Sequence, residues 1–67
     1  MNRRYREARL QKKLKLTEAA HRLGVSQPTL SAWERERKSP SVESLERMAD
    51  LYGVTTDFLL GRDMSGE

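Results

Sequence analysis

A glutamine and a cluster of cations, roughly two helical turns apart, are the residues of this chain best suited to binding chemistry. The side-chain amide of Gln27 offers a donor and an acceptor, the pattern that matches N6 and N7 of adenine. Arg35, Arg37 and Lys38 follow it, and such cations hold phosphates. The segment therefore combines a side chain that can both donate and accept hydrogen bonds with cations that can bind an anionic partner.

The charge of the chain is unevenly distributed. Residues 1–38 carry 11 Lys and Arg against 4 Asp and Glu, whereas residues 39–67 carry 2 against 6. This asymmetry favours a surface that faces a polyanion, although a solvated helix face would have the same composition. The basic run of Arg3, Arg4 and Arg6 is open in the same way, either an arm on the polyanion or a soluble end.

Composition excludes several classes of protein. The 67 residues make one domain at most and contain no cysteine and one histidine, His21, so neither a disulfide scaffold nor a metal site is expected. The longest apolar run, Phe58 to Leu60, is far too short to span a bilayer. With no glycine-rich phosphate loop and no nucleophile beside a base, we expect no enzyme, no cofactor and no small-molecule ligand.

Helical periodicity dominates the chain and predicts an all-α, compact bundle. Apolar residues recur at i, i+3, i+4 and i+7 from Leu16 and again from Leu45. Ser26, Ser41 and Thr55 are N-cap candidates. Helices are expected near 2–12, 16–23, 27–35, 42–52 and 56–60. The first is the least apolar, because only Tyr5, Ala8 and Leu10 offer it contacts.

The segment from Leu16 to Arg35 has the pattern of a helix-turn-helix. Gly24 suits a positive φ at the tight turn, and Ala20 is small where two helices would cross closely. Leu30 and Trp33, three residues apart, form the inner face of the following helix. Its outer surface is left to Gln27, Thr29, Ser31 and Ala32.

In these features the sequence resembles the Cro-type, lambda-repressor-like helix-turn-helix domains of phage repressors and bacterial regulators. The match runs from about Tyr5 to Gly61. It is carried by Arg9, Leu14, Ala20, Leu23-Gly24-Val25-Ser26, Leu30, Trp33-Glu34, Pro40-Ser41, Leu45, Ala49, Tyr52-Gly53-Val54 and Leu59-Leu60.

The resemblance implies a five-helix domain, residues 1–61, with the third helix in the major groove of DNA. The residues after it, 62–67, are expected to form a frayed tail. The implied base-reading residues are Gln27, Pro28, Ser31 and Ala32. The implied phosphate contacts are Arg35, Arg37, Lys38, Ser26, Thr29 and the backbone amide of Leu16. Arg9 and Glu34 match a pair that joins the first helix to the third.

Four residues depart from the family pattern. Leu16 stands where a phosphate-contacting glutamine is frequent, and Lys15 replaces a Ser or Thr cap. Lys13 and Glu36 stand where glycine is common after the first and third helices, so those two turns are expected to differ in shape.

The function implied is a sequence-specific transcriptional regulator, of the phage or bacterial repressor type, that binds double-stranded DNA in the bacterial cytoplasm and nucleoid. We expect a homodimer on a near-palindromic operator, with no membrane partner. Phe58, Leu59 and Leu60 are the possible dimer contact, unless they simply close the core. The alternative is a protein-interaction module on the same fold, such as an antitoxin or anti-repressor.

Overall fold

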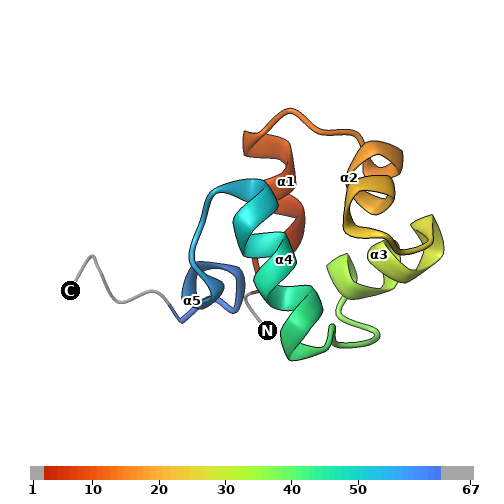
Figure 1. Cartoon of the computed structure of the whole chain (residues 1–67). Coiled ribbons are helices and arrows are strands. Elements are labelled where there is room, and N and C mark those ends of the chain that lie inside the picture. Colours follow the sequence, from red (N-terminus) through yellow and green to blue (C-terminus); the bar gives the residue numbers. More distant parts are fainter. Residues whose placement is uncertain (1–2, 63–67) are drawn as a thin grey trace.

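Five helices and short connections make up residues 3–62, which are the residues that the computed structural model describes. The helices are α1 (Tyr5–Gln11), α2 (Leu16–Leu23), α3 (Gln27–Glu34), α4 (Val42–Tyr52) and α5 (Thr56–Leu59) (Figure 1). The described part contains no strand, which confirms the all-α prediction. Of the predicted tail, residues 63–67 lie outside the described residues, and the amide of Arg62 still bonds to the carbonyl of Asp57 at 2.8 Å.

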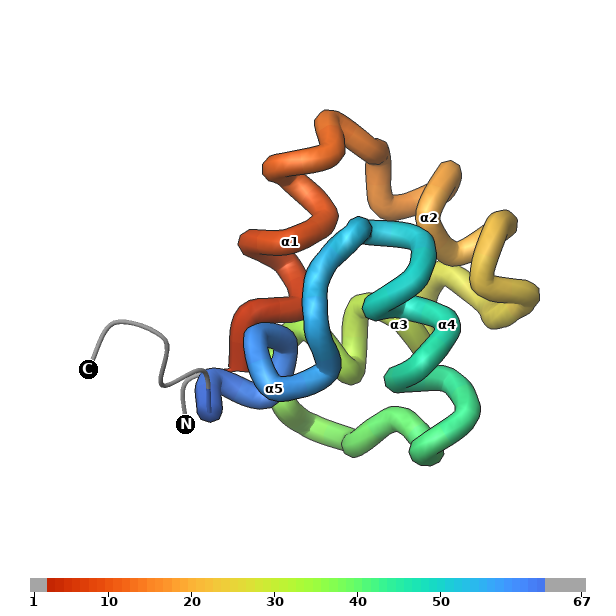
Figure 2. The backbone as a smooth tube through the Cα atoms, turned by 60° about the vertical axis from the view of Figure 1, so that its left-hand side comes forward, coloured from red at the N-terminus to blue at the C-terminus, as the bar shows by residue number. Residues whose placement is uncertain are grey.

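The long helix α4 lies at the centre of the bundle, in contact with α1, α2 and α5. Helix α3 packs on α2 and α1. Helices α2 and α3 therefore occupy one side of the molecule and α5 the other, with α1 and α4 between them (Figure 1). The start of α1 lies beside α5 (Figure 2), where the amide of Arg4 donates to the carbonyl of Leu59 at 2.8 Å.

Side-chain caps fix where three helices begin. The hydroxyl oxygens of Ser26, Ser41 and Thr55 each accept the backbone N–H three residues later, at 3.2, 3.1 and 3.0 Å. Each of these bonds satisfies an amide that has no partner within its helix. These contacts explain why the predicted starts of α3, α4 and α5 agree with the structure.

The core is built from aromatic, aliphatic and small side chains of all five helices. As predicted, Tyr5 and Trp33 belong to it, and Tyr52 is buried there too. The other buried apolar residues are Ala8, Ala19, Ala20, Leu23, Leu30, Met48, Ala49 and Leu59. The alanines of α2 let neighbouring helices approach closely, so a small chain encloses a continuous core.

Helix α1 differs from its prediction in extent and in the face that it buries. It begins at Tyr5 rather than near residue 2, because Arg4 has non-helical dihedral angles (φ −118°, ψ 32°) as the N-cap. Leu10, expected to be a core contact, is 51% exposed, whereas Arg9 is only 8% exposed. The expectation for Leu10 was wrong because its neighbour Arg9 finds partners for its charge inside the bundle.

The turns after α1 and α3 have the left-handed geometry that glycine favours, although neither contains glycine. Lys13 has φ 58° and Glu36 has φ 60°, close to the 73° of Gly24. The expectation that these turns differ in shape was therefore wrong. The two residues instead adopt a conformation that disfavours a side chain.

Candidate nucleic-acid interface

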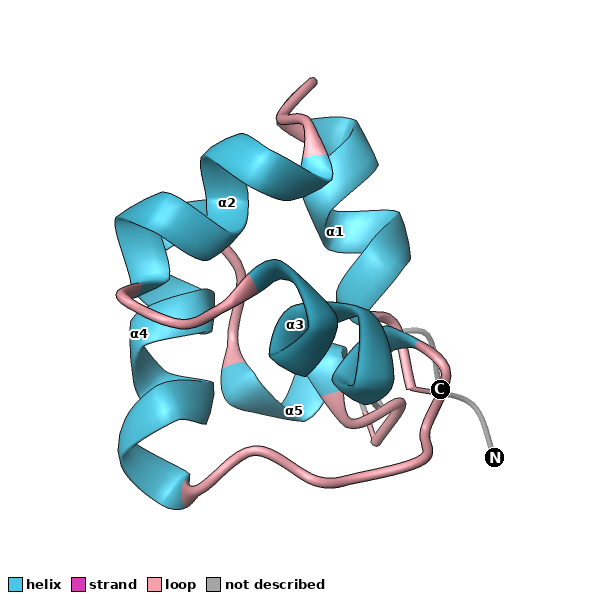
Figure 3. Cartoon of the chain, turned by 90° about the vertical axis from the view of Figure 1, so that its right-hand side faces the viewer, coloured by secondary structure: helices cyan, strands magenta, loops and turns pink. Residues whose placement is uncertain are grey.

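The helix-turn-helix predicted from the sequence is present. Helix α2 ends at Leu23, Gly24 reverses the chain with φ 73°, and Ser26 caps α3. Helix α3 then lies at the surface, between α2 and the loop that leads to α4 (Figure 3). The turn thus presents the first turn of α3 to a partner outside the molecule.

Burial divides α3 into two faces. Leu30 and Trp33 are buried and anchor the helix to the core. Gln27 and Pro28 are exposed, and Ser31 is partly buried. Ala32, also predicted to read bases, is partly buried as well. The four side chains expected to read bases thus keep surface exposure, and the two at the start of α3 are the most accessible.

An open groove of about 240 Å³ lies between the start of α2 and the start of α3. It is lined by Leu16, Gln27, Pro28 and Ser31. Two of these side chains are apolar and two can form hydrogen bonds. Three were predicted from the sequence to face bases, whereas Leu16 was assigned only a backbone contact.

A second groove adjoins the first and separates α1 from α3. Leu16 and Ser31 line both grooves, and the remaining residues of the second are Arg6, Arg9, Glu34 and Arg35. Because Arg9 and Glu34 neutralise each other, the exposed side chains of Arg6 and Arg35 give this groove a positive charge. We call the residues of the two grooves together the α3 face.

The pair of Arg9 and Glu34 ties α1 to α3, as expected. The Nε atom of Arg9 donates to Oε2 of Glu34 at 2.7 Å, and Nη2 donates to Oε1 at 3.1 Å. Nη1 donates to the carbonyl of Leu14 at 2.9 Å. The hydrogen bond that Arg9 donates to Glu34 raises the pKa of Arg9. This two-pronged geometry fixes the orientation of α3 on α1.

The cations expected to contact phosphates lie after α3. Arg35 is the C-cap of that helix, and Arg37 and Lys38 lie in the following loop, all three exposed. Within residues 3–62, no side-chain hydrogen bond or ion pair engages any of the three. Their charges are therefore available to an external anion.

The smaller phosphate candidates lie around the starts of α2 and α3. The hydroxyls of Ser26 and Thr29 are 2.7 Å apart, so each can orient the other toward a bound oxygen. Leu16 is the first residue of α2, and amides at that position have no acceptor within the helix. The side chain of Lys15 does not cap α2, but its amide donates to the carboxylate of Glu18 at 2.9 Å.

The basic run near the N-terminus divides between two sides of the molecule. Arg6 lines the second groove. Arg3 donates to the carbonyl of Leu60 at 3.0 Å, and the guanidinium of Arg4 lies 4.8 Å from the ring centre of Phe58. The sequence could not predict that these three arginines lie on different sides of the molecule, because their positions depend on the residue at which α1 begins.

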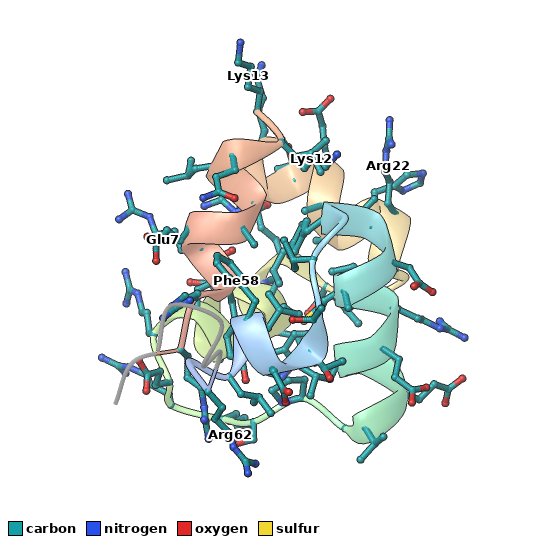
Figure 4. The ribbon with its side chains drawn as sticks, turned by 90° about the vertical axis from the view of Figure 1, so that its left-hand side faces the viewer. Glu7, Lys12, Lys13, Arg22, Phe58 and Arg62 are labelled. Carbon is teal, nitrogen blue, oxygen red and sulfur yellow. The ribbon has the colours of Figure 1, made fainter. Side chains whose placement is uncertain are left out.

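The α5 end offers less apolar surface than the sequence suggested. Leu59 is fully buried, so of the two alternatives for this residue it closes the core and is not available as a dimer contact. Phe58 and Leu60 are partly exposed, and Phe58 points from α5 toward the start of α1 (Figure 4). The buried position of Leu59 follows from α5 packing directly on α4.

Acidic side chains gather on α4, a helix that lines neither groove of the α3 face. Glu43, Glu46 and Asp50 are exposed along this helix. Arg47 on the same helix pairs with Glu43 at 3.1 Å.

The described residues contain no group of three or more side chains suited to hold a metal ion, and none of the described helices has the length and apolar character needed to cross a membrane.

Comparison with known proteins gives a consistent result. A family described as helix-turn-helix matches residues 6–59. The chain is 36% identical over 63 residues to the HTH-type transcriptional regulator ImmR of Bacillus subtilis, covering 94% of this chain and 50% of that protein. It is 40% identical over 65 residues to DdrOP3, an HTH-type transcriptional regulator of Deinococcus deserti, covering 96% and 50%.

A phage protein is also similar. The chain is 37% identical over 49 residues to the cryptic phage CTXphi transcriptional repressor RstR of Vibrio cholerae, covering 73% of this chain and 44% of that protein. The chain thus spans about half the length of the curated relatives it matches.

Proposed function

The chain belongs to the helix-turn-helix family, and we propose that it acts as a sequence-specific, double-stranded DNA-binding regulator of transcription. Helix α3 would lie in the major groove, which is wide enough to admit a helix. The observation that carries this proposal is the α3 face. There, the exposed amide of Gln27 lies in a groove that adjoins the cations Arg6 and Arg35.

The proposed roles follow the chemistry of each part of that face. Gln27 and Ser31 form hydrogen bonds to base edges, while Pro28 and Ala32 contact them through apolar groups. Phosphates on either side are held by exposed cations, by the two neighbouring hydroxyls at the start of α3, and by an amide at the start of α2. These are Arg35, Arg37, Lys38, Ser26, Thr29 and the backbone of Leu16, to which the second groove adds Arg6.

We further propose that two copies bind a near-palindromic operator. A dimer would place its two α3 helices in successive major grooves, ~34 Å apart. Phe58 and Leu60 are the partly exposed apolar residues at the α5 end, on the other side of the molecule from α3. The phage relative is a transcriptional repressor, and we propose repression for this chain too, acting in the bacterial cytoplasm and nucleoid.

The experiment that tests this function begins by selecting binding sites from a random DNA pool. Gln27→Ala is expected to weaken binding to the selected site by about 1–3 kcal/mol and to relax the preference at one base pair per half-site. Binding to scrambled DNA should hardly change, because phosphate contacts dominate it. Gln11→Ala, at an exposed glutamine at the end of α1, is the matched control.

Two outcomes would contradict the proposal. Equal losses on selected and scrambled DNA would assign Gln27 to a phosphate instead of a base. A chain that enriches no sequence and ignores nonspecific duplex at low salt would favour the alternative, a protein-interaction module such as an antitoxin or anti-repressor.

A further inference from the structure

We propose that Leu16 and Pro28 form a receptor for the C5-methyl group of a thymine, beside the base edge that Gln27 reads. The inference rests on the proposed DNA-binding function and deepens it. It gives the side chain of an α2 residue a direct part in choosing the operator, in addition to the phosphate contact expected from its backbone.

The first observation is the position of the Leu16 side chain. Leu16 packs partly against the core and also lines the groove between α2 and α3. Pro28, exposed in the first turn of α3, lines the same groove. Neither side chain carries a polar atom, so this part of the groove cannot satisfy the hydrogen-bonding groups of a base.

The second observation is that the remaining lining is polar. Gln27 and Ser31 complete the groove, and both can donate and accept hydrogen bonds. An A·T pair presents the same mixture in the major groove: N7 and O4 accept, N6 donates, and the thymine C5 carries a methyl group. A G·C pair has no methyl group and would leave the apolar part facing water.

The neighbouring groove explains why the occupant is part of a nucleic acid. Leu16 and Ser31 line both grooves, and the second carries the exposed cations Arg6 and Arg35. A partner that fills both must present apolar and hydrogen-bonding groups next to negative charge. A base edge and its flanking phosphates have this arrangement, whereas a purely apolar ligand would leave the two cations without a counter-charge.

The test removes the methyl group and nothing else. Each thymine of the selected operator is replaced singly by deoxyuridine, and the affinity of the whole chain is measured for each duplex. At one thymine per half-site, at or next to the pair read by Gln27, we expect the loss of the methyl group to weaken binding about fourfold, in line with burial of a single carbon. Other thymines should show ratios near one.

The same ratio is then measured in variants. In Leu16→Ala and in Pro28→Ala, the fourfold ratio at that thymine should fall toward one. Leu10→Ala, which truncates an exposed leucine on α1, should keep it. Because thymine and deoxyuridine duplexes are compared with the same protein preparation, partial unfolding of Leu16→Ala cancels from the ratio, and Pro28→Ala at an exposed position gives an independent reading.

Three results would overturn the inference, and they are distinguishable. If no thymine is sensitive while Gln27→Ala still loses specificity, base reading stands and the methyl receptor does not. If the fourfold ratio persists in both variants, the methyl group is recognised by another part of the chain. If no sequence is enriched at all, the proposed function itself fails.

Discussion

Arginines on two sides of this molecule have different roles. On the α3 face, Arg6 and Arg35 line a groove, and within residues 3–62 neither forms a side-chain hydrogen bond or ion pair. At the α5 end, Arg3 bonds to the carbonyl of Leu60 and Arg4 covers the ring of Phe58. Arginine side chains therefore stabilise the fold at the α5 end, whereas those on the α3 face remain available to a partner.

Arg9 lines a groove of the α3 face but is paired with Glu34. Among the changes considered, its removal is expected to have the largest effect on stability. Arg9→Ala should lower the free energy of unfolding by about 3 kcal/mol, because it leaves the carboxylate of Glu34 partly buried and unpaired. Denaturation of Arg9→Ala, Glu34→Ala and the double variant measures the coupling. Additive losses in the double variant would mean that the pair contributes no joint stabilisation.

The core between the two regions should respond to alkaline pH through Tyr52. Burial raises the pKa of Tyr52 to about 12, whereas an unfolded tyrosine titrates near 10. Since the folded pKa is the higher one, this contribution to stability is complete below pH 10 and is lost as the pH rises through 12. The loss reaches about 2 kcal/mol.

Tyr52→Phe isolates that contribution. The variant should lose less stability between pH 10 and 12 than the parent chain, as measured by urea denaturation at each pH. At neutral pH it should be as stable as the parent or slightly more so, because the buried hydroxyl of Tyr52 has no hydrogen-bond partner among residues 3–62. Identical alkaline profiles would show that folding does not raise the pKa of Tyr52 above its unfolded value. Burial also raises the pKa of Tyr5. Because Tyr5 is present in both proteins, its contribution cancels from the comparison.

The salt dependence of DNA binding compares the two kinds of arginine directly. With about four to six phosphates neutralised per subunit, log K should fall against log salt by roughly 0.9 per contact. Arg37→Ala or Lys38→Ala should flatten that slope by about one unit. Arg4→Ala, whose guanidinium is engaged by Phe58, should leave the slope unchanged. A slope altered equally by Arg4→Ala and Arg37→Ala would remove the distinction between the two sides.

The smallest expected effects concern the left-handed turns. Replacing Lys13 or Glu36 by glycine should raise the free energy of unfolding by about 0.5–1 kcal/mol, because glycine adopts a positive φ without strain. Thermal melts measure both. Only Glu36→Gly should also strengthen DNA binding, since it removes a negative charge between Arg35 and Arg37. A destabilised Lys13→Gly would mean that the added freedom of the unfolded chain outweighs the relief of strain.

The sequence was most informative where chemistry is local. The starts of α3, α4 and α5 depend on hydroxyl caps next to their first turns, and Leu30 and Trp33 identify the inner face of α3 from spacing alone. The same local signals indicated Gln27 as exposed. They also allowed the bounds of α2 to be predicted, although Lys15 cannot cap with its side chain, because the apolar stripe from Leu16 is itself sufficient.

Features that depend on tertiary contacts were not predictable in this way. Spacing alone favours Leu10 over Arg9 as the inward residue of α1, and only Glu34 and the carbonyl of Leu14 reverse that order. Whether Arg6 faces the α3 side depends on where α1 begins, and the burial of Leu59 depends on α4. The part of Leu16 in a groove with Pro28 required the crossing of α2 over α3 to be known.

The acidic side chains of α4 have a consequence for the speed of association. Glu43, Glu46 and Asp50 lie on a helix that packs against α1, α2 and α5 and forms no part of the α3 face. The molecule therefore carries an electric dipole as well as a net charge. If α3 is the helix that meets DNA, the field of the duplex would turn this dipole during diffusion, so that an encounter with α4 foremost would be repelled and one with α3 foremost would be accelerated. Orientation would thus be selected before any contact forms, and this advantage in rate would fade as salt shortens the range of the field.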